Sequence, residues 1–222
     1  RNTLEEMAEE ADRREWEYLG ISDHSKASFQ ANGLDEERLA RQVEAIHELN
    51  QSGRFRVHLF AGCEVDVLSG GKLDFDDEVL DTLDYVVASV HAGLTQDEET
   101  MTARFIKAIE HPRVTMVGHL SGRLLLRREA SKMDVNRIID AAVAHGTLLE
   151  LNANPMRLDL DWRQWKRAAE KGMLCCINPD AHALHHFDYQ LAGVNTARKG
   201  WLTAEQVLNT KPLPEVKDFL SR

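Results

Sequence analysis

The sequence predicts an α/β fold with a parallel sheet, in one domain. Six short apolar stretches alternate with amphipathic stretches of roughly 10 to 15 residues, the pattern of parallel strands joined by helices. No internal repeat, low-complexity tract or Gly/Ser linker divides the 222 residues, and a chain of this length can bury one large core. The apolar stretches end at histidines, carboxylates and asparagines, which are residue types common in catalytic and binding sites. This arrangement favours an α/β barrel enzyme.

The elements follow from apolar periodicity and from start and stop signals. Thr3 to Glu6 reads as a capping box before the first helix, Gly53 closes the second helix, and Gly146 closes a later one. The expected strands cover residues 18–21, 56–67, 85–90, 114–117, 148–151 and 173–177. The expected helices cover residues 2–15, about 35–51, 76–83, about 98–110, 134–145 and 161–171, followed by two short helices near 203–209 and 212–221.

Composition limits the class of protein. The content of 43% apolar and 29% charged residues is ordinary for a soluble globular domain, and no apolar run approaches the ~18 residues of a membrane span. Three cysteines, of which Cys175 and Cys176 are adjacent in an expected strand, form no disulfide framework and favour a reducing, cytoplasmic location. The net charge of −10 argues against a large basic footprint for duplex nucleic acid.

Candidate metal ligands follow successive strands. Because strand ends of one polarity open onto one face of an α/β barrel, residues far apart in the sequence are expected to converge there. Four imidazoles and two carboxylates are explained as ligands of a borderline divalent cation, Zn²⁺ or Mn²⁺. The polar residues at the strand ends are Asp23 with His24, Glu64, His91, His119, Asn152 with Asn154, and Asp180 with His182.

Such a site suits phosphoester hydrolysis. A carboxylate such as Glu64 can bridge two ions, of which one lowers the pKa of bound water and the other stabilises the leaving oxygen. A single histidine at a strand end is more often a hydrogen-bonding residue than a ligand, so the inference depends on the series. The histidines expected to be structural or superficial are His47, His58, His111, His145, His185 and His186. Arg123 follows His119 closely and is either a solvated side chain or a phosphate contact.

These motifs together resemble the PHP (polymerase and histidinol phosphatase) superfamily. The residues that carry the resemblance are Ser22-Asp-His24-Ser, Gly62-Cys-Glu64-Val, Ser89-Val-His91, Gly118-His119 and Asn178-Pro-Asp180-Ala-His182. More narrowly, the segments 121–128, 150–159 and 196–201 are similar to the C-terminal PHP domain of bacterial and archaeal family X DNA polymerases. The resemblance covers essentially the whole chain.

The resemblance implies a distorted, seven-stranded, TIM-like (β/α) barrel with two to three divalent ions, Zn²⁺ or Mn²⁺. His24 and His182 would serve one ion, Glu64 would bridge two, His91 and His119 would hold the second, and Asp180 would bind on the other side of Glu64. The implied catalytic residues are Asp180, His182 and Glu64. The implied substrate-binding residues are Arg123 and Arg157.

One family motif does not fall within the sequence. The His-x-His pair on the first strand of the family would precede Arg1, so the expectation is that residues 1–222 are an N-terminally truncated PHP domain that lacks this strand. The six candidate ligands would hold about one ion well or fill two sites incompletely, at the usual four ligands per zinc.

The leading hypothesis is a phosphoesterase domain of a family X DNA polymerase, acting as a 3′-5′ exonuclease or 3′-phosphatase on DNA ends in repair, beside an upstream polymerase domain. One alternative is a stand-alone small-molecule phosphatase that acts on phosphomonoesters such as histidinol phosphate. Another is a non-catalytic PHP scaffold domain. No membrane partner is expected.

Overall fold

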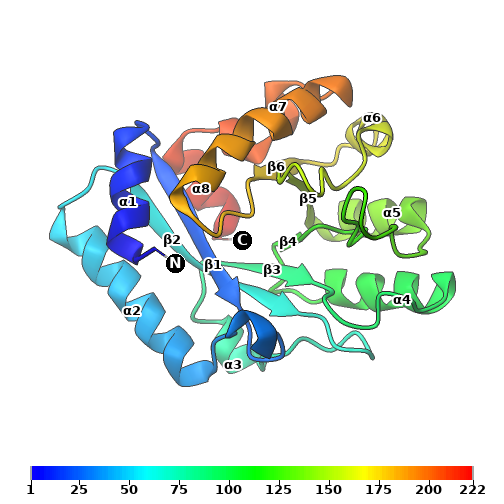
Figure 1. The fold of residues 1–222 in the computed structure, drawn as a ribbon, viewed down its shortest axis with the longest axis horizontal. Helices are drawn as coiled ribbons and strands as arrows, with labels where there is room; N and C mark the ends of the chain where they lie inside the picture. The colour runs from blue at the N-terminus through cyan, green and yellow to red at the C-terminus, as the bar shows by residue number, and fades with distance from the viewer. Residues whose placement is uncertain (1, 222) are drawn as a thin grey trace.

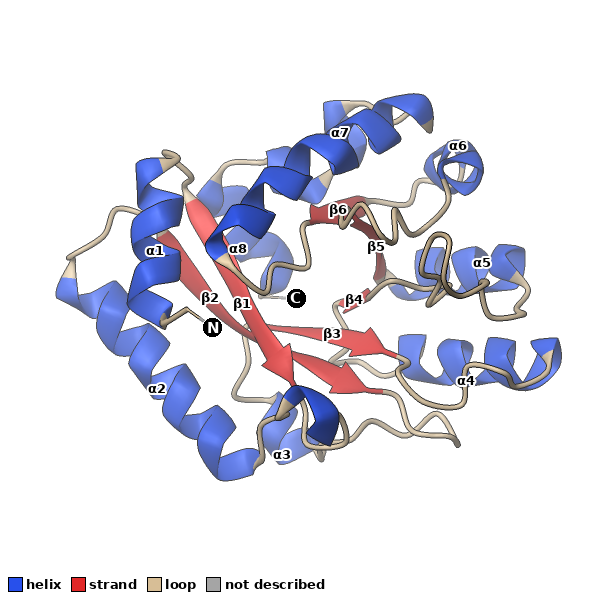
Figure 2. Cartoon of the chain, in the orientation of Figure 1, coloured by secondary structure: helices blue, strands red, loops and turns tan. Residues whose placement is uncertain are grey.

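The computed structural model describes residues 2–221 and has the predicted α/β class. Six parallel strands pair in the order in which they occur in the chain, and the sheet curves with most of its helices outside (Figures 1 and 2). The strands are β1 (Tyr18–His24), β2 (His58–Asp66), β3 (Tyr85–Ser89), β4 (Met116–Val117), β5 (Leu148–Asn152) and β6 (Cys175–Asn178). Within residues 2–221 no ladder joins β1 to β6, so the sheet is an open half-barrel. The seven-stranded barrel stays a prediction.

The helices begin and end where the capping residues indicate. The capping box of Thr3 and Glu6 is formed, and Gly53 and Gly146 adopt left-handed conformations after the second and fifth helices. The helices are α1 (Leu4–Arg13), α2 (Glu36–Ser52), α3 (Asp77–Leu80), α4 (Glu98–Ile109), α5 (Val135–His145), α6 (Trp162–Glu170), α7 (Gln190–Lys199) and α8 (Leu213–Leu220). No helix in the described part of the chain has the length and apolar character needed to cross a bilayer.

Two predictions of helices were wrong. The sequence predicts no element between β6 and residue 203, but a 3₁₀ turn (Leu184–Tyr189) and α7 fill this segment. Gly193 lets α7 approach the sheet, because a Cβ there would lie 2.4 Å from the Ile177 side chain and 2.6 Å from Ala153 Cβ. Residues near 203–209, predicted as a helix, form two 3₁₀ turns (Ala204–Gln206 and Leu208–Thr210).

Alternate residues of each strand face the outer helices or the concave side of the sheet. On β2, Cys63 and Val65 belong to the outer core that the helices cover, whereas Phe60 packs in an inner cluster with Val216 of α8. The concave side is therefore apolar where it meets α8, and it becomes polar toward the carboxyl ends of the strands.

Tyr85 lies between these two parts of the concave side. A Cβ at Gly62 would lie 2.3 Å from Tyr85 Cζ, and a Cβ at Gly20 would lie 2.5 Å from the Tyr85 hydroxyl oxygen. Both positions therefore have to be glycine for the buried ring to cross the sheet here. Glu64 comes two residues after Gly62 and faces the same side.

Candidate metal centre

Glu64 lies at the centre of a cluster of imidazoles at the carboxyl edge of the sheet. His119 Nε2 is 2.9 Å from Glu64 Oε1, and His91 Nε2 is 3.3 Å from the same oxygen. His24 Nδ1 is 3.3 Å from the other carboxylate oxygen, Oε2. Side chains from β1 and β2 and from the residues after β3 and β4 thus meet at one buried carboxylate.

The cluster shifts the ionisation of its members. Burial alone would raise the pKa of Glu64, but hydrogen bonds from His119 and His91 outweigh it and hold the pKa well below its usual range. Burial would lower the pKa of His91, but contacts with Asp66 and Glu64 outweigh it and raise the pKa to about 9. The pKa of His119 is also raised, by Glu64, against the effect of burial. Without a metal ion, the cluster is a buried carboxylate balanced by imidazolium charge.

The residues present fit a divalent metal ion. His24, Glu64 and His91 each offer one ligand atom, and these three atoms lie within 4.8 Å of one another. Among residues 2–221 the buried ring nitrogens His24 Nδ1 and His119 Nδ1 have no hydrogen-bond partner. Buried polar atoms are rarely left unpaired, and imidazole with carboxylate is a ligand set that Zn²⁺ accepts.

Asp66 orients His91, a role that the sequence analysis did not assign. Asp66 Oδ1 is 2.9 Å from His91 Nδ1, and Asp66 Oδ2 accepts a hydrogen bond of 2.6 Å from the Ser28 hydroxyl. A carboxylate behind the ring keeps a proton on Nδ1, so that Nε2 is the nitrogen available to bind a metal ion. The signal in the sequence is spacing, because Asp66 is two residues after Glu64 on the same face of β2.

Asp180 and His182 follow β6 and form a second group beside the cluster. His182 Nδ1 is 3.4 Å from Asp180 Oδ1, and the His182 ring centroid is 6.1 Å from that of His24. His182 is the most exposed of the six candidate ligands, with 57% of its side chain accessible. Asp180 Oδ2 instead faces Arg157, whose Nε is 3.3 Å away.

The two candidate substrate-binding arginines have different surroundings. Arg123 donates to Asp161 Oδ2 (2.8 Å) and to the backbone carbonyls of Arg157 and Leu158, so its guanidinium holds a loop together. Arg157 lies beside Asp180, and its buried Nη1 has no hydrogen-bond partner in the part of the chain that the structure describes. Of the two, Arg157 is therefore the arginine with a donor left for a ligand.

The remaining polar residues at the strand ends have local roles. Asp23 is exposed, and Asn154 Oδ1 accepts from the backbone N–H of Met156 in a turn. Asn152 instead links two carboxylates: it donates to Asp180 Oδ2 (3.1 Å) and to Glu150 Oε2 (3.2 Å). The pKa of Glu150 is raised to about 7, mainly by burial. The nearby His119 opposes this increase, and the Asp180 carboxylate adds to it. Glu150 was also missed, although it precedes Asn152 by two residues on the same face.

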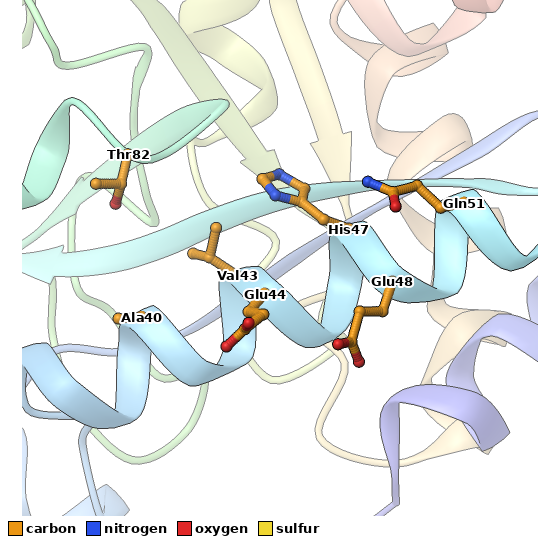
Figure 3. A pocket seen from close by; sticks show the side chains of 7 residues that line it. All are labelled: Ala40, Val43, Glu44, His47, Glu48, Gln51 and Thr82. Atoms are coloured by element: carbon orange, nitrogen blue, oxygen red, sulfur yellow. The ribbon is translucent and has the colours of Figure 1, made fainter.

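A surface hollow of about 490 Å³ lies away from this cluster, along α2 (Figure 3). Its lining residues are Ala40, Val43, Glu44, His47, Glu48, Gln51 and Thr82. His47, which the sequence predicts to be structural, is the single imidazole in this lining, and it lies on the same helix as both glutamates. The convergence of ligand types from different strands occurs around Glu64 and not here.

The chain is similar to a DNA polymerase with exonuclease activity and to proteins named as probable phosphatases. No family model matches it. It is 40% identical over 221 residues to the DNA polymerase/3′-5′ exonuclease PolX of Bacillus subtilis, an alignment that covers 99% of this chain and 38% of that protein. It is 24% identical over 229 residues to a "Probable phosphatase" of Caldanaerobacter subterraneus, covering 99% of this chain and 85% of that protein.

The fold has a solved counterpart. Histidinol phosphate phosphatase from Lactococcus lactis, crystallised with zinc, L-histidinol and phosphate, superposes with a TM-score of 0.60. The match covers 91% of this chain and 89% of that one, at 12% sequence identity, and shows that the two folds are alike.

Proposed function

The chain belongs to the PHP (polymerase and histidinol phosphatase) superfamily, and on this premise we propose that it is a metal-dependent phosphoesterase that acts on DNA 3′ ends, as a 3′-5′ exonuclease or 3′-phosphatase. The observation that carries the proposal is the convergence of His24, His91 and His119 on the Glu64 carboxylate. The identity of 40% to PolX supports the DNA substrate. That alignment spans 38% of PolX, so an upstream polymerase domain is part of the proposal.

The proposed ligands are His24, Glu64, His91, His119, Asp180 and His182, for two to three Zn²⁺ or Mn²⁺ ions. When bound, such ions supply a Lewis acid that activates water and offsets the charge of the leaving oxygen. Asp66 keeps a proton on Nδ1 of His91, which leaves Nε2 free to bind.

For hydrolysis of the ester, the protein also has to bind the phosphate group and orient the attacking water molecule. The free Nη1 of Arg157 donates to a phosphate oxygen, as guanidinium groups do in phosphate sites. Asp180 and His182, at the exposed side of the cluster, orient the water. The water oxygen bonds to phosphorus, the ester P–O bond breaks, and the alcohol oxygen of the leaving group takes up a proton.

A stand-alone phosphatase for small phosphomonoesters is the second candidate. Its support is the relative named as a phosphatase, which the chain matches over 85% of that protein's length. The same residues would serve both activities, because both cleave a P–O bond.

Hydrolysis assays with Mn²⁺ or Zn²⁺ test the proposal. We expect release of phosphate or nucleotides from a 3′-phosphorylated or 3′-hydroxyl oligonucleotide, and its loss in Asp180→Ala and His182→Ala. His111→Ala, which removes an imidazole paired with Asp77 away from the cluster, is the matched control and should keep wild-type activity. Turnover of histidinol phosphate alone would favour the second candidate. Full metal occupancy without turnover of any substrate would leave a scaffold domain.

A further inference from the structure

We propose that Glu150 is a positioning residue that fixes the separation of His119 and Asp180, the candidate ligands that follow β4 and β6. The inference rests on the proposed function of this site. Glu150 lies on β5, between the strands that carry these two residues, and it is only 6% exposed.

Glu150 is a buried acid that accepts three hydrogen bonds, from the His119 backbone and from two asparagine side chains. It accepts 2.7 Å from the His119 backbone N–H, 3.2 Å from Asn152 Nδ2 and 3.0 Å from Asn178 Nδ2. In the described part of the chain it makes no ion pair. Burying a carboxylate without a cation costs free energy unless hydrogen bonds compensate for the lost water. The position of Glu150 is therefore coupled to the positions of its three donors.

One connection reaches Asp180. Asn152 Nδ2 donates to both Glu150 Oε2 and Asp180 Oδ2, at 3.2 and 3.1 Å. Asp180 Oδ2 is thereby occupied, together with Arg157 on its other side, and Oδ1 is left facing His182. These contacts therefore leave Oδ1 of Asp180, and not Oδ2, available to bind a metal ion.

The other connection reaches His119. Its backbone has φ +23°, and Asp180 has φ +52°, values that residues with side chains rarely adopt. Such conformations persist where surrounding contacts determine them, commonly at functional sites. Glu150 contacts the first residue directly and the second through Asn152, so a single carboxylate secures both.

The variant Glu150→Gln tests this, because it keeps the size of the side chain while setting an amide NH₂ against a donor. We expect Mn²⁺ affinity, measured by calorimetry on the full chain, to fall by about 10- to 100-fold, the effect typical of residues behind metal ligands. We also expect kcat to fall with KM unchanged. Asp159→Asn is the matched control: Asp159 is equally buried but accepts from Ser121, so it should lower the melting temperature and leave Mn²⁺ affinity unchanged.

Asn152→Ala removes the connection between Glu150 and Asp180 while leaving the Glu150 carboxylate and its bond to the His119 backbone, and it supplies the same measurement if Glu150→Gln does not fold. It should weaken Mn²⁺ binding at least tenfold. Wild-type Mn²⁺ affinity and kcat in either folded variant would overturn the positioning role and leave the proposed function standing. A wild-type chain that neither binds Mn²⁺ nor hydrolyses phosphoesters would overturn both.

Discussion

The carboxylate of Asp66 lies 2.9 Å from Nδ1 of His91, on the side of the ring opposite to Glu64. The imidazole thus lies between two carboxylates. Asp66 fixes the proton on Nδ1, and Glu64 faces Nε2, the nitrogen proposed to bind the metal ion. The charge state of this ring therefore depends on whether a metal ion is bound, and several consequences of that can be measured.

Removing the charge behind His91 should weaken metal binding. Asp66→Asn keeps the shape of the side chain but supports the Nδ1 proton less, so we expect about 10- to 100-fold lower affinity for Zn²⁺. Competition with a fluorescent chelator measures this. Asp77→Asn changes a similar pair, Asp77 with His111 at 3.0 Å, on an exposed surface, and should leave affinity unchanged. Equal affinity in both variants would contradict the orienting role of Asp66.

The pH dependence of stability should reverse with metal. In chelated protein the pKa of His91 is raised to about 9 from an ordinary value of 6.5. The stabilisation by this group is therefore complete below pH 6.5 and is lost as pH rises through 9. Metal-loaded protein should instead gain stability over this range, because a ligand has to be deprotonated. Urea unfolding with and without chelator measures both, and His91→Gln should flatten the decline.

The two arginines should separate into different phenotypes. Arg157→Gln removes the free donor beside Asp180, so we expect at least a tenfold loss of kcat/KM with metal affinity retained. Arg123→Gln breaks contacts with Asp161 and two carbonyls and should cost about 1 to 3 kcal/mol of unfolding free energy, by thermal melting. The reverse pattern, with activity depending on Arg123, would restore Arg123 as the phosphate contact.

Adding a methyl group at Gly62 should destabilise the fold. The new Cβ would lie 2.3 Å from Tyr85 Cζ, and overpacking of this kind costs about 1 to 3 kcal/mol. Gly70→Ala is the control, since nothing lies within 4 Å of a Cβ there. In a Tyr85→Ala background the penalty of Gly62→Ala should shrink, which a double-mutant cycle of unfolding free energies measures. Additive penalties would mean that the two residues do not compete for the same space.

The fold was predictable from sequence where the signal was local. Apolar stretches marked the strands, and the capping box of Thr3 and Glu6 together with Gly53 and Gly146 marked helix ends, because these caps form in the structure. α7 was missed because its identity depends on tertiary packing: Gly193 is a poor helix former, and its use is to let the helix approach Ile177.

The site was predictable to the extent that strand ends predict convergence. The sequence indicated His24, Glu64, His91 and His119 from their positions, and the structure brings them together. Glu150 and Asp66 were not assigned roles, because a hydrogen bond behind a ligand leaves no spacing motif of its own. Arg123 and Arg157 could not be distinguished, because the difference lies in which carbonyls each guanidinium contacts.

Tyr85, lying across Gly20 and Gly62, also has a consequence for how such a chain can change. The ring occupies the space that a side chain at either glycine would need, and it belongs to the apolar cluster that includes Val216 of α8. Because the ring fills the space beside Gly20 and Gly62, a larger side chain at either of these positions requires a smaller one at position 85.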